Sequence, residues 1–337
     1  MAQASRARIE SFNSNNHLLD LENIFTFPTK SLDFFSQVTF ESGLTTATNN
    51  QNNSYSVGLY EQQNQNSNWV VALGRQNQVI QKSRAKYKIV TGETYDVSNN
   101  SIHLIRSFKS DGLGYSLGLY SSERRDLQAA EHEISQTLLL GLRTGHFTFS
   151  LEGALKNEMQ SPASKLIQIT NNVAGSILYE VENLFLSAQL DFFTGKQENS
   201  GLESQSFDHQ LFTFAFSDLS LLGSRLFFYR IDVIIENLKY NLSTVKERSN
   251  KVPLTLGFET PITNYIKVRS AVTQTFLISN DQDRSATENN TLVSTGLEYA
   301  QDRFKLEALL DGLTSGTANQ KIDSSNLFSR VSVTYLF

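Results

Sequence analysis

The 337-residue sequence contains no cysteine, few proline and methionine residues, and no excess of positive charge. The lack of cysteine excludes a disulfide-stabilised fold and a zinc site built from thiolates. With 29 Lys and Arg against 34 Asp and Glu, the chain offers no basic surface for nucleic acid. The longest unbroken apolar runs, such as residues 138–140, are short. No helix of about 20 apolar residues is therefore predicted to cross a membrane.

Aromatic residues are abundant instead. The chain has 23 Phe and 12 Tyr, and such residues favour β-strands over helices. Length alone suggests two domains of about 150 residues, but an all-β barrel often uses a chain of this size as one domain. The first residues carry no apolar core of a signal peptide. If the protein is exported, we expect this to be a mature chain with an added or retained Met.

Apolar and polar residues alternate along much of the chain with a period of two. The clearest example is the C-terminal end, where Val331, Val333 and Tyr335 alternate with Ser332 and Thr334. The same period recurs over residues 147–156, 184–192, 212–216 and 304–311. Helical spacing does not produce this pattern. It predicts strands of about 9 to 12 residues with one apolar face, the length that a tilted strand needs to cross a membrane.

The alternation predicts sixteen strands, centred near Val38, Val57, Val71, Leu104, Leu117, Leu140, Leu151, Val173, Ala188, Phe214, Val233, Leu256, Val268, Thr295, Leu306 and Val333. Long polar connections, such as residues 121–131 and 195–209, follow the odd-numbered strands, and short ones follow the even-numbered strands. This asymmetry is typical of a membrane barrel with long outer loops and tight periplasmic turns. Since lipid offers backbone groups no hydrogen-bond partner, the sheet has to close. The predicted fold class is all-β, a transmembrane antiparallel up-and-down β-barrel, with 14 or 18 strands as alternatives.

The chain ends with Tyr335-Leu336-Phe337 after an alternating strand. This end resembles the terminal signature of Gram-negative outer-membrane β-barrels of the porin-like kind. In that family a terminal Phe, with an aromatic residue two positions before it, is read by the barrel-insertion machinery. The resemblance implies a bacterial outer-membrane location and assigns Tyr335 and Phe337 as the assembly signal.

Residues 1–32 do not alternate and precede the sheet. We predict a periplasmic N-terminal segment or plug over residues 1–32 and a barrel over residues 33–337. Residues 19–29 more weakly resemble the pre-barrel segment of FadL-like transporters, which often carries an Asn-Pro-Ala motif. Here the tripeptide is Phe27-Pro28-Thr29. Two of its three positions differ from the motif, so no fatty-acid site is carried over.

Residues that alternate with the lipid-facing apolar set point into the lumen. This phase places the following charged residues inside: Arg143, Glu152, Lys156, Asp191, Arg230, Asp232, Glu236, Glu259, Lys267, Arg269, Glu298, Lys305, Glu307 and Arg330. Arg230, Asp232 and Glu236 lie on one strand, and Lys267 and Arg269 lie two strands further on. The mixed signs predict a transverse field at a constriction, together with a salt-bridge network in the wall. For any single residue, simple solvation is the alternative.

Residues 75–98 form the longest predicted connection and concentrate positive charge, at Arg75, Lys82, Arg84, Lys86 and Lys88. Such a loop could fold inward as a constriction that attracts anions, or it could contact lipid phosphates at the outer surface. A solvated loop is the reading that we favour.

Arg106 does not fit the alternation. It shares the phase of Ile102 and Leu104, so an unbroken strand would direct it toward lipid. A position near the membrane interface would reduce that cost to about 0–1 kcal/mol. A β-bulge that shifts the phase is the simpler explanation, and we expect one here.

The predicted function is that of an outer-membrane porin, a passive diffusion channel for small polar solutes and ions. One alternative is a FadL-like transporter of hydrophobic compounds plugged by residues 1–32. Inward aromatic residues would favour it, with candidates at Phe185, Phe193, Phe228 and Phe328. The other alternative is a structural or interaction barrel whose long loops bind a partner.

We expect no enzyme, no metal site and no cofactor. No Gly-x-Ser-x-Gly motif is present, and the histidines lie on different segments, at His17, His103, His132, His146 and His209. The expected partners are outer-membrane lipid, the barrel-assembly machinery and small polar solutes, and no nucleic acid. Whether the protein forms an oligomer stays open.

Overall fold

The computed structural model describes most of the chain. The described residues are 8, 12, 17, 21–44, 53–64, 66–82, 100–126, 131–160, 166–198, 205–240, 246–280, 290–315 and 330–337. Two short 3₁₀ helices, η1 (Leu21–Phe25) and η2 (Pro28–Asp33), precede the first strand. No helix in this part of the chain is long and apolar enough to cross a membrane.

Sixteen strands follow, which confirms the predicted number, and each predicted centre lies within one of them. They are β1 (Gln37–Leu44), β2 (Asn53–Asn64), β3 (Ser67–Leu73), β4 (Ser101–Ser110), β5 (Leu113–Asp126), β6 (Glu131–Thr144), β7 (Phe147–Gln160), β8 (Leu166–Val181), β9 (Leu184–Glu198), β10 (Gln205–Leu222), β11 (Arg225–Tyr240), β12 (Lys246–Pro261), β13 (Ile266–Asn280), β14 (Asn290–Gln301), β15 (Phe304–Ser315) and β16 (Arg330–Leu336).

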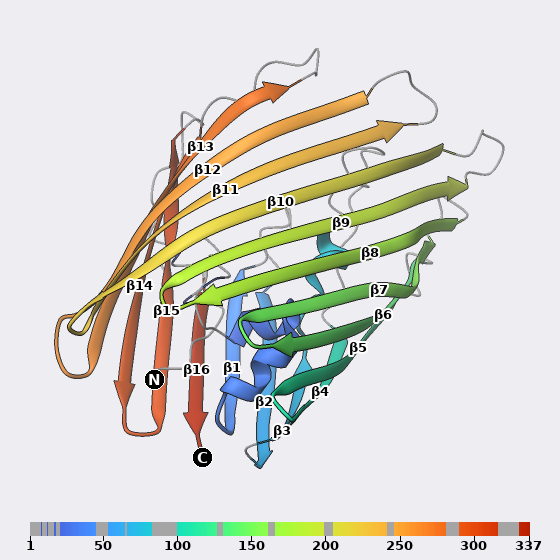
Figure 1. The fold of residues 1–337 in the computed structure, drawn as a ribbon. Helices are drawn as coiled ribbons and strands as arrows, with labels where there is room; N and C mark the ends of the chain where they lie inside the picture. Colours follow the sequence, from blue (N-terminus) through green and yellow to red (C-terminus); the bar gives the residue numbers. More distant parts are fainter. Residues whose placement is uncertain are drawn as a thin grey trace.

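The strands form a closed antiparallel barrel in which each strand pairs with its sequence neighbours. β1 pairs with β2 on one side and with β16 on the other, so the first and last strands close the sheet (Figure 1). Closure supplies every strand with two hydrogen-bonding neighbours, as a sheet in lipid requires. The predicted up-and-down topology is confirmed.

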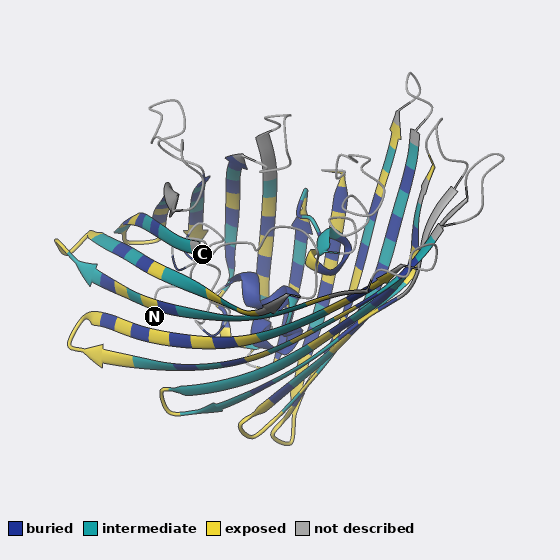
Figure 2. Cartoon of the chain, turned by 90° about the horizontal axis from the view of Figure 1, so that it is seen from above, coloured by how far each residue is buried: buried dark blue, intermediate teal, exposed yellow. Residues whose placement is uncertain are grey.

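Along many strands, buried residues alternate with more exposed ones (Figure 2). In β4, Ser101, His103 and Ile105 are buried, whereas Ile102 and Leu104 are exposed. The outer face carries an almost continuous set of Leu, Val, Ile, Phe and Tyr side chains around the barrel. An apolar exterior over a polar interior is the arrangement of a barrel that sits in a bilayer.

Strands β5 to β13 are longer than the sequence pattern predicts. β5 continues to Asp126 and β6 begins at Glu131, so most of the predicted loop over residues 121–131 is strand. β10 alone has 18 residues. We infer that strand pairing continues beyond the hydrocarbon layer, where water contacts both faces and the apolar half of the alternation is no longer required. Periodicity therefore reports the membrane-embedded part of each strand.

One predicted inward residue is wrong. A bulge lies between β6 and β7, where Gln136 pairs with Lys156 but Thr137 pairs with Ala154. The bulge shifts the phase by one residue, so Asn157 takes the buried position and Lys156 is exposed. The Lys156 Nζ lies 3.2 Å from the Glu158 carboxylate on the same side of the strand.

An arginine placed on the outer face and one placed on the inner face should change stability by different amounts. Phe214 is exposed on the outer face at the middle of β10, and its neighbour Thr213 faces inward. We expect Phe214→Arg to lower the free energy of unfolding in lipid vesicles by about 2–4 kcal/mol, and Thr213→Arg to lower it far less. Guanidinium unfolding in vesicles measures both, and equal losses would contradict the assignment of faces.

Candidate functional site

The two helices of the N-terminal segment, η1 and η2, lie inside the barrel wall (Figure 2). The fold of the segment is local: the Asn23 carbonyl accepts hydrogen bonds from the amides of Thr26 (3.1 Å) and Phe27 (2.6 Å). Pro28 then occupies the first turn of η2, where its missing amide hydrogen costs nothing. The tight turns give the segment two faces, one apolar and one polar.

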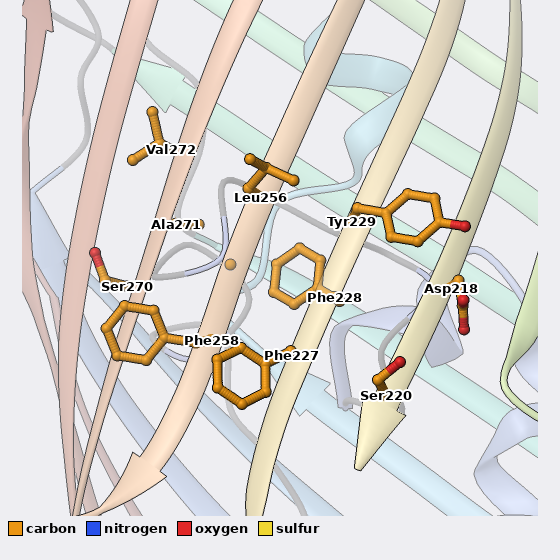
Figure 3. A pocket seen from close by; sticks show the side chains of 11 residues that line it. Asp218, Ser220, Phe227, Phe228, Tyr229, Leu256, Phe258, Ser270, Ala271 and Val272 are labelled. Atoms are coloured by element: carbon orange, nitrogen blue, oxygen red, sulfur yellow. The ribbon is translucent and has the colours of Figure 1, made fainter. Parts of the chain in front are cut away.

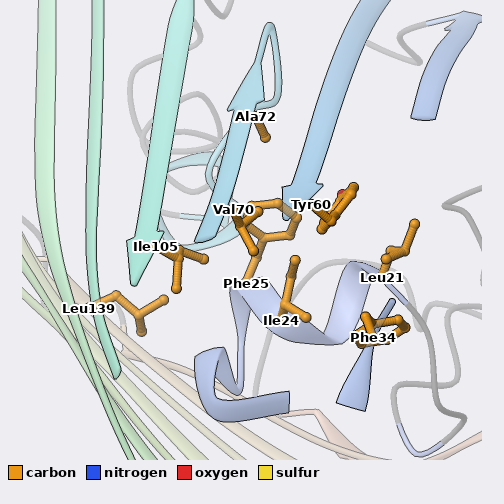
Figure 4. Packing of buried hydrophobic residues seen from close by; sticks show 9 residues of the cluster. All are labelled: Leu21, Ile24, Phe25, Phe34, Tyr60, Val70, Ala72, Ile105 and Leu139. Atoms are coloured by element: carbon orange, nitrogen blue, oxygen red, sulfur yellow. The ribbon is translucent and has the colours of Figure 1, made fainter. Parts of the chain in front are cut away.

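The apolar face packs on the inner surface of β2, β3, β4 and β6. Four side chains of the segment meet five of the wall in one buried cluster (Figure 4), formed by Leu21, Ile24, Phe25, Phe34, Tyr60, Val70, Ala72, Ile105 and Leu139. Burial of each large apolar side chain contributes about 1.5–3 kcal/mol. This cluster fixes η1 against one side of the lumen.

A second apolar contact lies across the lumen on β11 and β13. The ring of Phe12 meets the ring of Phe228 edge to face, with centroids 5.2 Å apart. Leu226 and Ala271 complete this buried cluster. The segment thus contacts widely separated strands of the wall.

Polar contacts tie η2 to β3, β4, β6 and β8. The Ser31 hydroxyl donates to the Ser107 hydroxyl at 2.7 Å. Lys30 pairs with Glu180 on β8. The carboxylate of Asp33 accepts hydrogen bonds of 2.7 and 2.8 Å from Arg143, one of the predicted lumenal residues. The side-chain amide of Asn68 donates a hydrogen bond from Nδ2 to the Ser31 backbone carbonyl at 2.8 Å.

The predicted charges on β12 to β15 gather around Arg269, which is 1% exposed. Its guanidinium contacts three carboxylates: Glu259 at 2.7 Å, Glu307 at 2.8 Å, and Glu298. Such a bonding pattern uses the fork of donors that only arginine carries.

Three further cations surround the same glutamates. Lys305 Nζ lies 3.0 Å from Glu307 and 3.2 Å from Glu298. Lys267 lies 3.3 Å from Glu298 and 3.4 Å from Glu259. The third cation comes from the N-terminal segment, because Arg8 Nε lies 3.2 Å from Glu259. We call these seven side chains the Arg269 cluster: Arg8, Glu259, Lys267, Arg269, Glu298, Lys305 and Glu307.

Charges on β10 and β11 also pair locally. Arg230 contacts Asp232 on the same strand through three hydrogen bonds of 2.6, 2.8 and 3.0 Å. The Glu236 carboxylate accepts a hydrogen bond from His209 Nε2 at 2.8 Å. Opposite charges therefore lie side by side here, and the predicted salt-bridge network accounts for their geometry better than opposed walls of a transverse field.

The start of the basic connection folds inward instead of projecting as a solvated loop. Arg75 is buried, pairs with Glu22 of η1, and stacks over the Phe25 ring at 4.0 Å. A helical turn over residues 78–82 follows. Lys82 Nζ at its end lies 2.7 Å from Asp191 on β9. Arg84, Lys86 and Lys88 lie outside the described residues.

The remaining predicted residues occupy the expected faces. Glu152 is buried and accepts a 2.6 Å hydrogen bond from Thr137, and Arg330 is buried at the start of β16. Tyr335 and Phe337, the predicted assembly signal, are exposed on the outer face. Arg143 and Asp191 pair with Asp33 and Lys82, outside the Arg269 cluster, which holds only part of the predicted set.

His17 links the segment to β9 and β10. Its Nδ1 lies 2.6 Å from the Ser217 hydroxyl and its Nε2 lies 2.6 Å from the Ser187 hydroxyl. The neutral ring satisfies both, because one nitrogen donates and the other accepts. Burial lowers the pKa of His17 well below its usual value of 6.5, and the charges of Arg230 and Lys30 lower it further.

The sequence did not identify five contact residues of the segment: Arg8, His17, Glu22, Lys30 and Asp33. None of them lies in an alternating stretch, so no phase assigned them a direction. Their signal was the presence of both charge signs in a segment that precedes a barrel with mixed lumenal charge.

A pocket of about 400 Å³ lies at β10 to β13 (Figure 3). Most of its large lining side chains have the membrane-facing phase, namely Phe227, Tyr229, Leu256, Phe258 and Val272. The pocket therefore belongs to the lipid-facing surface and not to the lumenal site.

No family model matches the sequence, and no curated protein matches it. Among solved structures, a FadL homologue of Pseudomonas aeruginosa aligns over 100% of this chain and 99% of its own, with 10% identity and a TM-score of 0.50. A loop-deletion mutant of the Vibrio cholerae outer membrane protein OmpT covers 90% of this chain and 97% of its own, with 10% identity and a TM-score of 0.47.

An anion-selective porin from Comamonas acidovorans covers 90% of this chain and 98% of its own, with 11% identity and a TM-score of 0.38. At 10% identity, the likeness to the FadL homologue is one of fold. Together with the closed sheet and its apolar exterior, this likeness shows the fold of a bacterial outer-membrane β-barrel.

Acid should loosen the N-terminal segment. Docked His17 has a lowered pKa and stays neutral, whereas His17 in a released segment takes up a proton as the pH falls below about 6.5. The proton therefore binds the released state, and docking is strongest above that pH and weakens below it. We expect faster hydrogen exchange over residues 21–34 at about pH 5.5 than at about pH 7.5, after correction for intrinsic rates.

The matched control is His17→Gln, which removes the titrating ring. In this variant the corrected exchange over residues 21–34 should no longer change between the two pH values. A pH dependence that persists in His17→Gln would assign the effect to another group.

Proposed function

We propose that this protein is a passive outer-membrane channel for small polar solutes whose lumen is plugged by residues 1–32. One observation carries the proposal: the N-terminal segment contacts inward-facing residues from β2 to β13. Arg8 reaches Glu259, His17 reaches Ser187 and Ser217, and Lys30 reaches Glu180. A periplasmic segment that lay outside the barrel would not make these contacts.

The wall that the plug covers is suited to polar solutes. Inward positions carry acidic and basic side chains on many strands, among them Glu152, Asp191, Arg230, Asp232 and Lys267. Displacing the segment would leave Glu259 and Glu180 without one of their partners, and water or a polar solute would then solvate them. A barrel of this width holds an aqueous lumen unless something fills it.

The mechanism is diffusion once the plug has moved. Closed and open states differ in two apolar clusters and several ion pairs, so the closed state is favoured by contacts that act together. Moving only part of the segment releases only part of them. Movement of η1 and η2 would open the side of β2 to β6, because the buried cluster of Leu21, Ile24 and Phe25 lies there.

A second candidate is transport of a hydrophobic compound. Phe193, Phe207 and Leu238 are buried on the inner phase near the long-loop ends of β9, β10 and β11. The rings of Phe193 and Phe207 meet edge to face at 6.0 Å. An apolar patch at the mouth suits an apolar solute, whereas Phe185 and Phe228, also inward, contact His17 and Phe12 of the segment. Phe328 lies outside the described residues.

The assembly signal is a further part of the proposal. Tyr335 and Phe337 are exposed on the outer face of the last strand, where an insertion machinery could bind them before closure. The Phe337 amide donates to the Ser36 carbonyl at 3.2 Å after closure.

Because the chain has no cysteine, an engineered disulfide can lock the plug. The hydroxyl oxygens of Ser31 and Ser107 are 2.7 Å apart, so the pair Ser31→Cys and Ser107→Cys suits a disulfide between η2 and β4. In planar bilayers we expect the intact chain to be closed for most of the time, and the chain without residues 1–32 to show stable open steps.

The oxidised double variant should show no openings, and a reductant should restore the level of the intact chain. Ser107→Cys alone controls for the substitution. Stable open steps from the oxidised double variant, equal to those of the truncated chain, would contradict the plug. Efflux of a polar sugar and uptake of an apolar dye into the same vesicles distinguish the two candidate solute classes.

A further inference from the structure

Arg106 lies on the membrane-facing surface of the barrel. Its neighbours on the same face, Ile102, Leu104 and Phe108, are exposed, whereas Ile105 and Ser107 are buried. The pairing of β4 with β3 and with β5 is continuous through Arg106. The β-bulge expected from the sequence is therefore absent from this described strand, and the arginine keeps its outward direction.

Aromatic rings hold the guanidinium in place. Its central carbon lies 4.5 Å from the ring centroid of Trp69 on β3 and 4.7 Å from that of Phe108. The Nη1 atom is buried and has no hydrogen-bond partner in the described part of the chain. Cation–π contact with two rings orients a cation but does not neutralise it.

No described carboxylate neutralises this cation. Glu61 is the acidic residue at the same level, because it pairs with Trp69, which in turn pairs with Arg106. Glu61 is thus two strands away, roughly 10 Å. Lys109, three residues along β4, adds positive charge. Since a charge on a lipid-facing wall is costly, a counter-charge has to come from the surroundings.

The depth of Arg106 identifies the source of that charge. β4 ends at Ser110, followed by a short turn. Four residues of a tilted strand correspond to roughly 10 Å along the membrane normal. Trp69, Phe108 and Tyr115 lie at this level, as aromatic residues at a membrane interface do. Arg106 therefore lies where headgroups meet hydrocarbon, in the leaflet on the side of the short turns.

We propose that Arg106, Trp69 and Phe108 form a binding site for the phosphate of an anionic phospholipid in that leaflet. The rings cover one part of the guanidinium, and its remaining N–H groups donate to phosphate oxygens. Arginine suits this role because its planar fork matches phosphate geometry and its weak hydration lowers the cost of leaving water. The acyl chains of the lipid then lie along Leu104 and Ile102. This site is independent of the plug.

The test uses Trp69 as a reporter, because it is the only tryptophan of the chain. The full-length protein is refolded into phosphatidylcholine vesicles that contain brominated phosphatidylglycerol or, in parallel, brominated phosphatidylcholine. Bromine quenches Trp69 fluorescence only when a brominated lipid occupies the adjacent position. We expect phosphatidylglycerol to be preferred over phosphatidylcholine by roughly fivefold in relative binding constant.

Two variants make the outcome specific. Arg106→Gln should abolish the preference, and Arg106→Lys should retain part of it, since it keeps the charge but loses the fork. Arg225→Gln is the matched control: it removes an exposed arginine beside another short turn and should leave the preference unchanged. Equal quenching by both lipids in the intact protein, or an unchanged preference in Arg106→Gln, would overturn the proposal. Inorganic phosphate in the buffer should not reduce the preference for phosphatidylglycerol. If added phosphate abolished this preference, the site would be assigned to free phosphate and the proposal would be overturned.

Discussion

The structure depends on the pairing of β1 with β16. In a bilayer each unpaired backbone group costs several kcal/mol, so a sheet of this kind exists in lipid only when its two edges meet. Seven residue pairs, from Gln37 with Leu336 to Gly43 with Arg330, close it. Closure gives every strand one face toward the lumen and one face toward lipid. It also places the chain that precedes Gln37 at the mouth of the lumen on the side of the short turns.

Closure creates the electrostatic problem that the lumen then has to solve. Inward residues of neighbouring strands are brought together, and many of them carry charge. Taking an ion out of water costs several kcal/mol unless it is well paired. The wall pairs some charges by itself, as Arg230 and Asp232 do. The N-terminal segment supplies partners for others, through Arg8 with Glu259 and Lys30 with Glu180. The contacts that place the N-terminal segment in the lumen are therefore also contacts that pair lumenal charges.

The sequence revealed the strands because the membrane imposes a period of two on every one of them. It revealed the inward charges for the same reason, and Arg269, Glu298 and Glu307 lie where their phase put them. The inward direction predicted for Lys156 was wrong because a bulge is a local change of register that composition does not indicate. The prediction for Arg106 was wrong in the opposite way. A bulge was expected, but the strand is regular, and the rings of Trp69 and Phe108 make the lipid-facing position tolerable.

The contacts of the N-terminal segment could not be predicted by these means. Arg8 and Glu259 are 251 positions apart, and His17 and Ser217 are 200 positions apart. No periodicity connects such residues, since their proximity exists only after the barrel has closed. The inward fold of Arg75 and Lys82 was considered but not favoured for a similar reason, because a polar connection has the same composition in water and in a polar lumen. Long-range pairing is a property of the closed barrel.

The central claim is that the segment before β1 occupies one defined place inside the closed barrel. Spin labels at Thr26→Cys, between η1 and η2, and at Arg225→Cys, at the start of β11, give an inter-label distance distribution in lipid bilayers by pulsed electron paramagnetic resonance. A single narrow distribution at neutral pH is the result expected of a docked segment. A broad distribution, like that of a free tail, would contradict the claim.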